Sequence, residues 1–596
     1  MKKPQVQPAA GGSNSNSAKP VNLFLLLSFA LFLVFITSFK ISGDDDIFWH
    51  LATGRYIVET KTVPSADIFG YVTAGQQWIP FEWSWDVLNY LVYTISGFAG
   101  ISILRTLVFM VMFYFLFKLL QRIKVSIPIF IIVSTLLVFG IIDRLLPKPQ
   151  IISYLFFTIL LYLIIEYRNS RKVNHRFLYY IPVLFVIWTN MHMGVLLGSV
   201  ILALFVISEL LLFFIPKKLS TKEMQAPSKS DLKRVLLVFL LSLAALLINP
   251  FGFKTYTYVY THLNMRMLEQ VFEWYSPFNR VFEGSIFFYV YLVFAGASLL
   301  ILYYSFRKMD VFAGILILVF LVFSTRAARY SLDYMVISAP FFAISLDYLL
   351  SKLKNKSILA YLTNKRGIKI ALALILLAIS AAIMSDPLYK FLNYTRSSGF
   401  GIDNRDYPVK MFEFIKQNDI DKTGDRVFNS FDCGGYLIWE LPGEKNFIDS
   451  RNLNDEIFYN YSVINEKAKG FEKKINEYDI EYIIWFYSNL VNDPDEMQRT
   501  LIPYLIGKND EWKLVYWDDN SFLFVKNISK FKDIISKYEY KIVNPYYYAF
   551  EREPLLKAYN ENRQLVFEEI KRKMRTDPEG EFTNSFVKTF KINAGK

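Results

Sequence analysis

The sequence predicts an α-helical protein that crosses a membrane many times and carries an α/β domain after its last membrane helix. Of the 596 residues, 53% are hydrophobic and only 20% are charged, which is below the roughly 25% typical of soluble domains. Several apolar runs reach the length of about 20 residues that a helix needs to cross a bilayer. After residue 400 the composition changes to that of a soluble domain.

The N-terminal segment combines a polar tail with a long apolar run. Residues 1–20 are rich in Gly, Ser, Asn and Pro, which is typical of a disordered tail. Residues 21–41 have the hydrophobicity of a signal peptide, but the run is too long and no small-residue cleavage site precedes Gly43. We therefore expect the first transmembrane helix here.

Ten further apolar runs have the composition of membrane-spanning helices. They lie at residues 101–120, 127–143, 150–166, 177–190, 193–215, 235–249, 286–306, 310–325, 331–350 and 368–385. The sequence thus predicts about eleven transmembrane helices within a membrane domain of residues 21–390.

Lys and Arg gather in alternate connections between these runs, in those that start at residues 121, 166, 216, 306 and 351. Cytoplasmic loops of membrane proteins carry such an excess of basic residues. The pattern predicts that the N-terminus and these connections are cytoplasmic, whereas the other connections and everything after residue 386 face outward. Because the loops account for the net charge of +13, we do not expect nucleic-acid binding.

The C-terminal part alternates short strand-like runs with helical patterns, as α/β units do. The runs are RVFNS, KNFIDS, EYIIWF, WKLVYWD and SFLFVK. The predicted organisation is a tail at residues 1–20, a membrane domain at 21–390 with a large first outer loop at 42–100, an outer α/β domain at 400–527 and a helical extension at 528–596.

Candidate functional residues gather in the connections predicted to face outward. The first outer loop begins with GDDDIFWHLATGRYI, in which three adjacent aspartates follow the first membrane helix. Acids, histidines, tryptophans and isolated arginines at one membrane face suit a charged, amphipathic substrate. The candidates are Asp44, Asp46, Trp49, His50, Arg55, Glu82 and Trp83 in this loop, and Arg144, Lys148, His192, Glu273, Trp274, Arg326 and Arg329 in later outer turns.

Each kind of candidate also has a purely structural interpretation. One aspartate can cap the helix that IFWHLATGRYIVET predicts, and tryptophans form aromatic belts at membrane interfaces. Arginines near helix ends extend toward lipid headgroups, the Glu82 and Asp86 pair can form a solvated helix face, and His192 can satisfy a turn. The occurrence of these residues on one predicted side favours the functional interpretation.

Common enzyme signatures are missing from the sequence. It contains no phosphate-binding glycine loop, no zinc-ligand spacing and no nucleophile elbow. The glycine-rich DCGGYL at residue 432 is more typical of a helix that opens after a strand. Cys433 is the only cysteine, which excludes an internal disulfide.

The segment DDDIFWHLATGRYIVETKTVPSADIFGYVTAGQQWIPFEW resembles a family of bacterial and archaeal polytopic membrane proteins. Its pattern opens with D-x-D-x-W-W-H-L-A-T-G-R and continues with V-P-x-x-D-x-F and H-E-W; here Phe48 replaces the first Trp and Phe81 replaces the His before Glu82. The resemblance extends through WTNMHMGVLLG, LINPFGFKTY, EWYSP, RAARY, VFNSFDCGGYLIWELP and FIDSR, over most of residues 43–525. This family is similar to a distant branch of the type C glycosyltransferase superfamily.

The superfamily resemblance implies a polytopic enzyme of the bacterial inner membrane that takes a sugar from a polyprenyl-phosphate carrier at the outer, periplasmic side. It also implies that a first-loop aspartate is the catalytic base or lies beside it. Inverting transfer needs a carboxylate that deprotonates the acceptor as the glycosidic bond breaks. Asp44 or Asp46 suits this role, with Glu82 as a second acid, and the acceptor is a glycan, a lipid or a protein.

The leaving phosphate needs cations, for which Arg144, Lys148, Arg326 and Arg329 are candidates. Asp44 and Asp46 are alternatively a candidate site for a divalent metal such as Mg or Mn, which would neutralise the phosphate. Trp49 or Trp83 would stack on the sugar, and the remaining candidates would contact the substrate.

Two other functions fit parts of the sequence. A transporter or flippase for a lipid-linked glycan would use the same substrate, but transporters place ionisable residues near the bilayer midplane, where these apolar runs are nearly free of charge. A non-catalytic assembly protein would use its outer α/β domain to bind a partner.

Overall fold

The computed structural model describes residues 15–215, 226–353, 366–392, 394, 396–451 and 454–591. Their contacts divide the chain into two compact units. The membrane unit comprises residues 1–40, 96–252 and 271–401, and the α/β unit comprises residues 41–95, 253–270 and 402–596. The C-terminal part of the chain therefore packs with two segments that lie between membrane helices in the sequence, residues 41–95 and 253–270.

The membrane unit is a set of helices, and each predicted apolar run coincides with one of them in the described part of the chain. The helices are α1 (Ser15–Thr37), the second part of α3 (Trp83–Arg122), α4 (Ile127–Gly140), α5 (Gln150–Ser170), α6 (Arg176–Thr189), α7 (Val195–Phe214), α8 (Lys229–Ala245), α10 (Ile286–Lys308), α11 (Val311–Ser324), α12 (Ala328–Leu353), α14 (Arg366–Met384) and α15 (Pro387–Phe391).

Seven of the described helices are long and apolar enough to cross a membrane, namely α1, α3, α5, α7, α10, α12 and α14. Another three, α4, α6 and α11, are apolar but only 14 residues long. The predicted helices are therefore confirmed as helices. That about eleven of them cross the membrane, and in which direction, stays a prediction.

Local sequence explains where several of these helices begin. Ser285 accepts the Phe288 N–H at 3.2 Å at the start of α10, and Asp310 accepts the Ala313 N–H at 3.3 Å at the start of α11. These side chains satisfy N–H groups that have no partner within the helix. Many leucines on the helices point outward, such as Leu240 and Leu299, which are 62% and 75% exposed. Such surfaces are stable only in contact with lipid.

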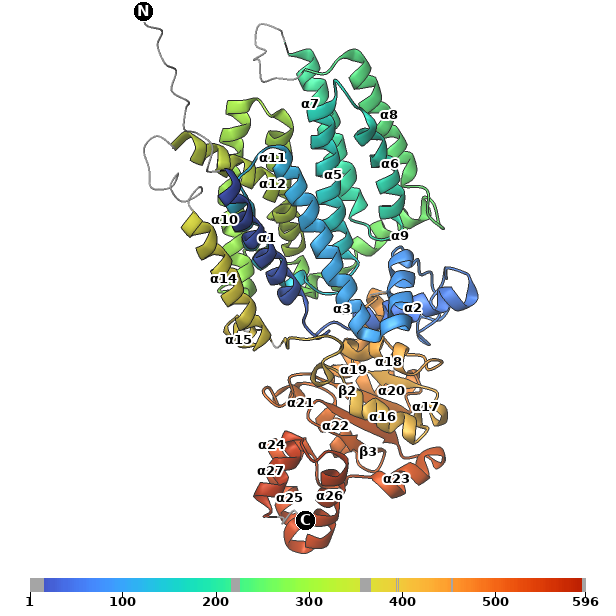
Figure 1. The fold of residues 1–596 in the computed structure, drawn as a ribbon. Helices are drawn as coiled ribbons and strands as arrows, with labels where there is room; N and C mark the ends of the chain where they lie inside the picture. Colours follow the sequence, from blue (N-terminus) through green and yellow to red (C-terminus); the bar gives the residue numbers. More distant parts are fainter. Residues whose placement is uncertain are drawn as a thin grey trace, which may run out of the picture. The chain divides into compact units, whose positions relative to one another are not determined.

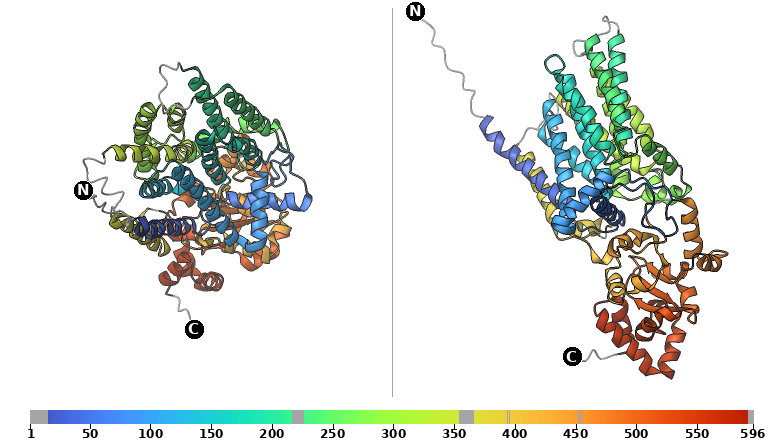
Figure 2. Two further views of the ribbon diagram at one scale, coloured as in Figure 1. Left: turned by 45° about the horizontal axis from the view of Figure 1, so that its top comes forward. Right: turned by 90° about the vertical axis from the view of Figure 1, so that its right-hand side faces the viewer.

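The helices of the membrane unit lie side by side (Figures 1 and 2). The helix α1 packs along α14, although more than 300 residues separate them in the sequence, whereas α10, α11 and α12 pack on one another. Elsewhere α6 packs between α5 and α8. Helices α6 and α7 are separated by the turn that contains Asn190 and His192, so the sequence WTNMHMG joins two helices rather than bending one.

The helix α3 changes unit at a glycine. Residues up to Ile95 belong to the α/β unit, and those from Ser96 belong to the membrane unit. At Gly97 the helix is interrupted by φ 58° and ψ −155°. This conformation is accessible to glycine and strongly disfavoured for residues with a Cβ. The position of Gly97 therefore determines where the first outer loop ends and the membrane helix starts.

The α/β unit contains a four-stranded sheet with the order β1-β2-β4-β3. The strands are β1 (Val427–Asn429), β2 (Tyr482–Phe486), β3 (Trp512–Trp517) and β4 (Ser521–Lys526). Strand β1 pairs in parallel with β2, with Phe428 opposite Ile483, and the other two pairings are antiparallel. The strands are almost completely buried, which explains why they read as continuous apolar runs.

The α/β unit also contains helices (Figure 1). They are α2 (Asp46–Thr60), α9 (Lys254–Leu263), α16 (Val409–Gln417), α17 (Ile420–Thr423), α18 (Gly434–Glu440), α19 (Asp455–Asn465), α20 (Phe471–Glu477), α21 (Glu496–Arg499), α22 (Ile502–Gly507), α23 (Lys532–Tyr538), α24 (Pro545–Ala549), α25 (Arg552–Glu561), α26 (Arg563–Thr576) and α27 (Glu581–Thr589). Of these, α16, α22 and α23 contact the sheet. The predicted α/β domain and helical extension share one hydrophobic core, to which both Trp485 and Phe586 belong.

One predicted strand is wrong. KNFIDS does not join the sheet; Asn446 instead forms an isolated parallel bridge with Gly70 of the first outer loop. The Asn446 N–H donates to the Phe69 carbonyl at 3.0 Å, and the Tyr71 N–H donates to the Asn446 carbonyl at 3.1 Å. The alternation of the segment is that of an extended chain, but its hydrogen-bond partner is a loop almost 400 residues away in the sequence.

Candidate functional site

The acidic cluster of the first outer loop consists of Asp44, Asp45, Asp46, His50, Glu82 and Asp86, all within the α/β unit. Helix α2 starts at Asp46, which confirms the helix predicted for this stretch. Asp45 occupies its N-cap position but makes no side-chain cap bond there. The three aspartates therefore have three different surroundings.

Asp45 caps a helix from the other end of the chain. Its carboxylate oxygens accept the N–H groups of Gly435 at 2.7 Å and Tyr436 at 2.9 Å, at the start of α18. A Cβ on Gly435 would lie 2.5 Å from the Asp45 carbonyl oxygen, so glycine permits this close approach. The glycines of DCGGYL thus serve packing against the first outer loop, and the helix predicted to open after a strand is confirmed.

Asp44 and Asp46 differ in accessibility. Asp44 is 2% exposed, and its backbone N–H and carbonyl both bond the Tyr407 hydroxyl, at 3.2 and 3.1 Å. One Asp44 oxygen also accepts the Asp46 N–H at 3.3 Å, which fixes the start of α2. Asp46 is half-buried and accepts the Trp49 indole N–H at 3.3 Å. Of the two, Asp46 is therefore the carboxylate that a substrate can reach.

A histidine lies between two carboxylates in the same cluster. His50 is 2% exposed, and its Nδ1 lies 2.5 Å from Oδ1 of the fully buried Asp86. Burial and the neighbouring Glu82 raise the pKa of Asp86, and the short contact with this buried carboxyl group holds the His50 ring in one orientation. The other ring nitrogen, Nε2, lies 3.9 Å from the Glu82 carboxylate. This separation is longer than a hydrogen bond, so a proton can pass between Glu82 and His50 through a bridging water or after a small side-chain movement.

Aromatic rings frame the cluster. The Trp49 ring stacks on His50 with centroids 3.6 Å apart, and the Arg55 guanidinium lies 4.6 Å from the Trp439 ring centroid. The predicted residues Trp49, His50 and Glu82 thus come together, whereas Arg55 packs on α18. Trp83 is the first residue of α3, and its backbone N–H donates to the Pro80 carbonyl. Sequence reasoning missed the role of Asp86, although its spacing of one turn from Glu82 was visible.

The arginine cluster of the membrane unit consists of Arg144, Glu273, Trp274 and Arg329. Glu273, in the short helix Phe272–Trp274, forms ion pairs with Arg144 and, at 3.3 Å, with Arg329. The Arg329 guanidinium lies 4.6 Å from the Trp274 ring centroid. Four predicted residues from three connections therefore meet in one place.

The charges of this cluster do not cancel. Burial opposes ionisation of Glu273, but Arg144 and Arg329 outweigh it and hold the pKa of Glu273 well below its usual range. Within the cluster, two arginines face one ionised carboxylate; in its surroundings Lys148 adds positive charge, whereas Asp143 and Asp333 are neighbouring acids. The side chains of the three ion-paired residues are 14–25% exposed, so an anion can reach the guanidinium groups.

Two further predicted residues of the membrane unit lie in other surroundings. His192 accepts the Gly194 N–H on Nδ1 at 3.0 Å, and the same nitrogen lies 2.6 Å from the Ser153 hydroxyl, so Nε2 carries its proton. Arg326 is exposed at a groove of about 320 Å³ between α7 and α11. The other residues that line this groove are apolar: Leu197, Val200, Val319, Phe320, Val322 and Phe323.

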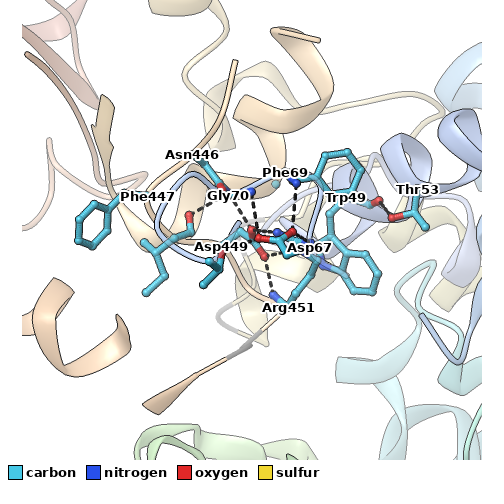
Figure 3. A network of polar contacts seen from close by, with 12 residues as sticks. Trp49, Thr53, Asp67, Phe69, Gly70, Asn446, Phe447, Asp449 and Arg451 are labelled. Atoms are coloured by element: carbon cyan, nitrogen blue, oxygen red, sulfur yellow. Dashed lines mark hydrogen bonds and ion pairs between the residues drawn. The ribbon is translucent and has the colours of Figure 1, made fainter. Parts of the chain in front are cut away.

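A buried triad of Asp67, Asp449 and Arg451 joins the first outer loop to the C-terminal part of the α/β unit (Figure 3). Arg451 contacts Asp67 at 2.6 Å and Asp449 at 2.6 Å, and none of the three side chains is more than 3% exposed. Asp67 also accepts the N–H groups of Phe69 and Gly70, each at 3.0 Å. Burial raises the pKa of Asp449, but Arg451 outweighs it and the pKa lies below its usual value.

Within the described residues, the candidate metal site of Asp44 and Asp46 receives no third ligand. In the part of the chain that the structure describes, no three His, Cys, Asp or Glu side chains are grouped as metal ligands require. Asp44 and Asp46 offer two carboxylates, of which one oxygen of each already accepts a hydrogen bond. These residues by themselves do not fit a divalent metal site.

Comparisons with known proteins identify the fold. No family model and no curated protein matches the sequence. Among solved structures, the chain is similar to the oligosaccharyltransferase of Archaeoglobus fulgidus in the apo form, with a TM-score of 0.51 and 13% identity over 85% of this chain and 74% of that chain. The same enzyme tethered to an acceptor peptide containing the NVT sequon gives a TM-score of 0.50 at 13% identity, with the same coverage.

ArnT from Cupriavidus metallidurans bound to undecaprenyl phosphate also matches, at a TM-score of 0.45 and 10% identity over 86% of this chain and 99% of that chain. At these identities the likeness concerns the fold alone. The oligosaccharyltransferase match confirms the predicted resemblance to type C glycosyltransferases at the level of the fold.

Proposed function

We propose that this chain is a membrane glycosyltransferase that moves a sugar from a polyprenyl-phosphate carrier to a glycan, lipid or protein acceptor at the outer face of a bacterial inner membrane. The arginine cluster carries this proposal. A cluster that keeps net positive charge beside an aromatic ring, on a unit of membrane helices, suits the phosphate of a lipid-linked sugar. The fold of the oligosaccharyltransferase from A. fulgidus supports the same class of reaction.

The donor phosphate is assigned to Arg144 and Arg329. Planar guanidinium groups bind two oxygens of a phosphate at once, which lysine cannot do. As the glycosidic bond breaks, negative charge develops on the leaving phosphate, and the fixed arginines stabilise it. Lys148 contributes to the same potential. Arg326, at its apolar groove, is suited to hold the carrier where the phosphate meets the prenyl tail.

The base is assigned to the acidic cluster. Asp46 is the accessible first-loop aspartate, and Glu82 is the accessible acid beside His50, with a side chain that is 13% exposed. In the proposed step, one of these carboxylates takes the proton of the acceptor hydroxyl. The oxygen then bonds to the anomeric carbon while the bond from that carbon to the phosphate oxygen breaks. Asp44 is buried, with its backbone hydrogen-bonded to the Tyr407 hydroxyl, and its carboxylate positions Asp46.

The acceptor and sugar contacts are assigned to residues around these groups. Trp49 and Trp83 present aromatic faces suited to a sugar ring, and His50 with Asp86 can receive or return a proton through Glu82. His192, Arg55, Glu273 and Trp274 remain proposed substrate contacts. The proposed topology has a cytoplasmic N-terminus and an α/β unit on the outer side.

Native mass spectrometry of the protein purified in mild detergent tests this proposal. Wild type, Asp46→Asn and Glu82→Gln are compared for a co-purifying polyprenyl-phosphate sugar, and Glu59→Gln, an exposed carboxylate at the end of α2, is the matched control. A stalled transferase accumulates the donor, so the two site variants should retain more donor than wild type and the control. Equal transfer by all variants in an assay with the identified donor would sink the assignment of the base.

Metal dependence is tested in the same transfer assay. The proposed transfer step uses only protein groups, so EDTA should leave the initial rate unchanged, as measured with labelled donor. A rate lost in EDTA and restored by Mg or Mn would instead require a metal ligand beyond Asp44 and Asp46.

A transporter of lipid-linked glycans is the second candidate, because one arginine is fully buried within a membrane helix. Arg105 in α3 is 0% exposed, with its Nη2 donating to the Phe39 carbonyl at 2.5 Å. Buried ionisable residues in membrane helices often mark substrate pathways. Counterflow of labelled lipid-linked glycan in proteoliposomes, with no covalent product, would favour this function over glycosyl transfer.

A further inference from the structure

A charged cavity lies at the other end of the membrane unit from the arginine cluster. It has a volume of about 280 Å³ and lies among the last turns of α5, α7 and α10 and the middle of α12. Both α5 and α10 begin near the arginine cluster in the sequence and end at this cavity. The lining residues are Ile123, Ile165, Arg168, Asn169, Arg171, Leu212, Tyr304, Lys308, Met309, Asp310, Phe341 and Ile344.

The charged residues of the cavity are held in place. Arg168 pairs with Asp310 at 3.0 Å, and Asp310 at the same time caps α11. Arg171 pairs with the fully buried Glu209 at 2.8 Å. Lys308 lies over the Tyr348 ring, 5.3 Å from its centroid. Asp310 and Glu209 each balance one arginine, so the net positive charge of the cavity comes from Lys308.

Apart from Asn169 and Tyr304, the rest of the lining is apolar. Its apolar wall is defined by Ile165, Leu212, Phe341 and Ile344. Other side chains of the same helices, such as Phe214 on α7 and Phe306 on α10, are 73% and 77% exposed, which is stable only against acyl chains. The cavity therefore combines fixed cations for an anionic head with apolar lining residues, on helices that expose apolar side chains to lipid.

We propose that this cavity binds the phosphate headgroup of an anionic membrane phospholipid, with the acyl chains along the apolar wall. Basic pockets between transmembrane helices bind anionic lipid headgroups, and the predicted orientation places this end on the cytoplasmic side. A free phosphate ion would use the cations but not the apolar wall. The proposal does not depend on the proposed glycosyl transfer, because the cavity and the arginine cluster share no residue.

Lipid titration followed by native mass spectrometry tests the site. The full chain in mild detergent is titrated with phosphatidylglycerol and with phosphatidylcholine of the same acyl chains. Wild type should retain the anionic lipid preferentially. Lys308→Gln should weaken phosphatidylglycerol binding about fivefold, the effect of one cation near a charged membrane surface. Ile344→Trp fills the cavity and removes no charge, and it should also weaken phosphatidylglycerol binding. This second variant tests the site even if Lys308→Gln does not fold.

Lys118→Gln is the matched control. Lys118 also lies over a tyrosine ring, 5.7 Å from the Tyr114 centroid, but it does not line the cavity. This variant should bind phosphatidylglycerol as wild type does. Equal binding by wild type and Lys308→Gln, or equal retention of both lipids by wild type, would overturn the proposal. Displacement by millimolar inorganic phosphate, or stronger binding of polyprenyl monophosphate, would overturn the phospholipid assignment.

Discussion

The two arginine–carboxylate triads of this protein have opposite compositions. In the α/β unit, one arginine, Arg451, is surrounded by two aspartates, and the side chains are at most 3% exposed. In the membrane unit, one carboxylate, Glu273, lies between two arginines whose side chains are 14% and 24% exposed. The first triad is closed to solvent and the second is open to it. The same ion-pair chemistry can therefore serve to join distant segments of the chain or to receive an anion.

Removal of Arg451, the central arginine of the closed triad, should have the largest effect on the free energy of unfolding. Arg451→Met would leave Asp67 and Asp449 buried without their cation, which costs about 3–5 kcal/mol. The thermal unfolding midpoint of the purified protein should fall by roughly 10 °C. Arg499→Met is the control, because Arg499 is 61% exposed and its ion pairs contribute little. Equal midpoints for Arg451→Met and wild type would show that the closed triad does not hold the loop.

Removal of one arginine from the open triad should affect binding more than stability. Arg329→Gln leaves Glu273 paired with Arg144, so the unfolding midpoint should change little. Binding of polyprenyl monophosphate, measured by native mass spectrometry, should weaken about tenfold because one charge-assisted contact is lost. The exposed Arg280→Gln is the matched control. A large loss of stability without loss of binding would mean that Arg329 has a structural role, like Arg451 in the closed triad.

The stability of the protein should depend on pH through Glu273, the carboxylate at the centre of the open triad. The pKa of folded Glu273 lies below its ordinary value of 4.5, so its stabilising charge is complete above that value and is lost as the pH falls through the lower folded value. The difference in unfolding midpoint between wild type and Glu273→Gln should be constant from about pH 7 to pH 5 and narrow below about pH 4.5. Parallel curves over the whole range would contradict the ion pairing.

Replacement of Trp274, the aromatic neighbour of Arg329, should have the smallest effect on ligand binding. Trp274→Leu removes the ring under Arg329 and leaves both ion pairs in place. An exposed cation–π contact contributes about 0.5–1 kcal/mol, so binding of polyprenyl monophosphate should weaken two- to fivefold. Phe272→Leu, an exposed aromatic on the same short helix, should bind as wild type does. A loss as large as that of Arg329→Gln would mean that Trp274 contacts the ligand directly.

Local patterns predicted the helices well and the long-range pairings poorly. The apolar runs, the strands β1 to β4 and the helix behind Asp46 depend on periodicity and caps, which neighbouring residues determine. KNFIDS has the pattern of a strand, and the structure pairs Asn446 with Gly70 instead. Asp45 has the position of an N-cap for α2, yet it caps α18. In both cases the partner is hundreds of residues away and leaves no local signal.

The sequence by itself determined the membrane character, the positions of the helices and the residue types from which a phosphate site and a base can be built. Hydrophobicity and helix periodicity are local properties, and they need no knowledge of tertiary contacts. Only the tertiary structure decided that Glu273 joins Arg144 to Arg329, that Asp86 orients His50, and that Arg451 closes on Asp67. Whether a charge is paired, buried or accessible depends on segments that folding brings together, because Coulomb interactions and desolvation act through space.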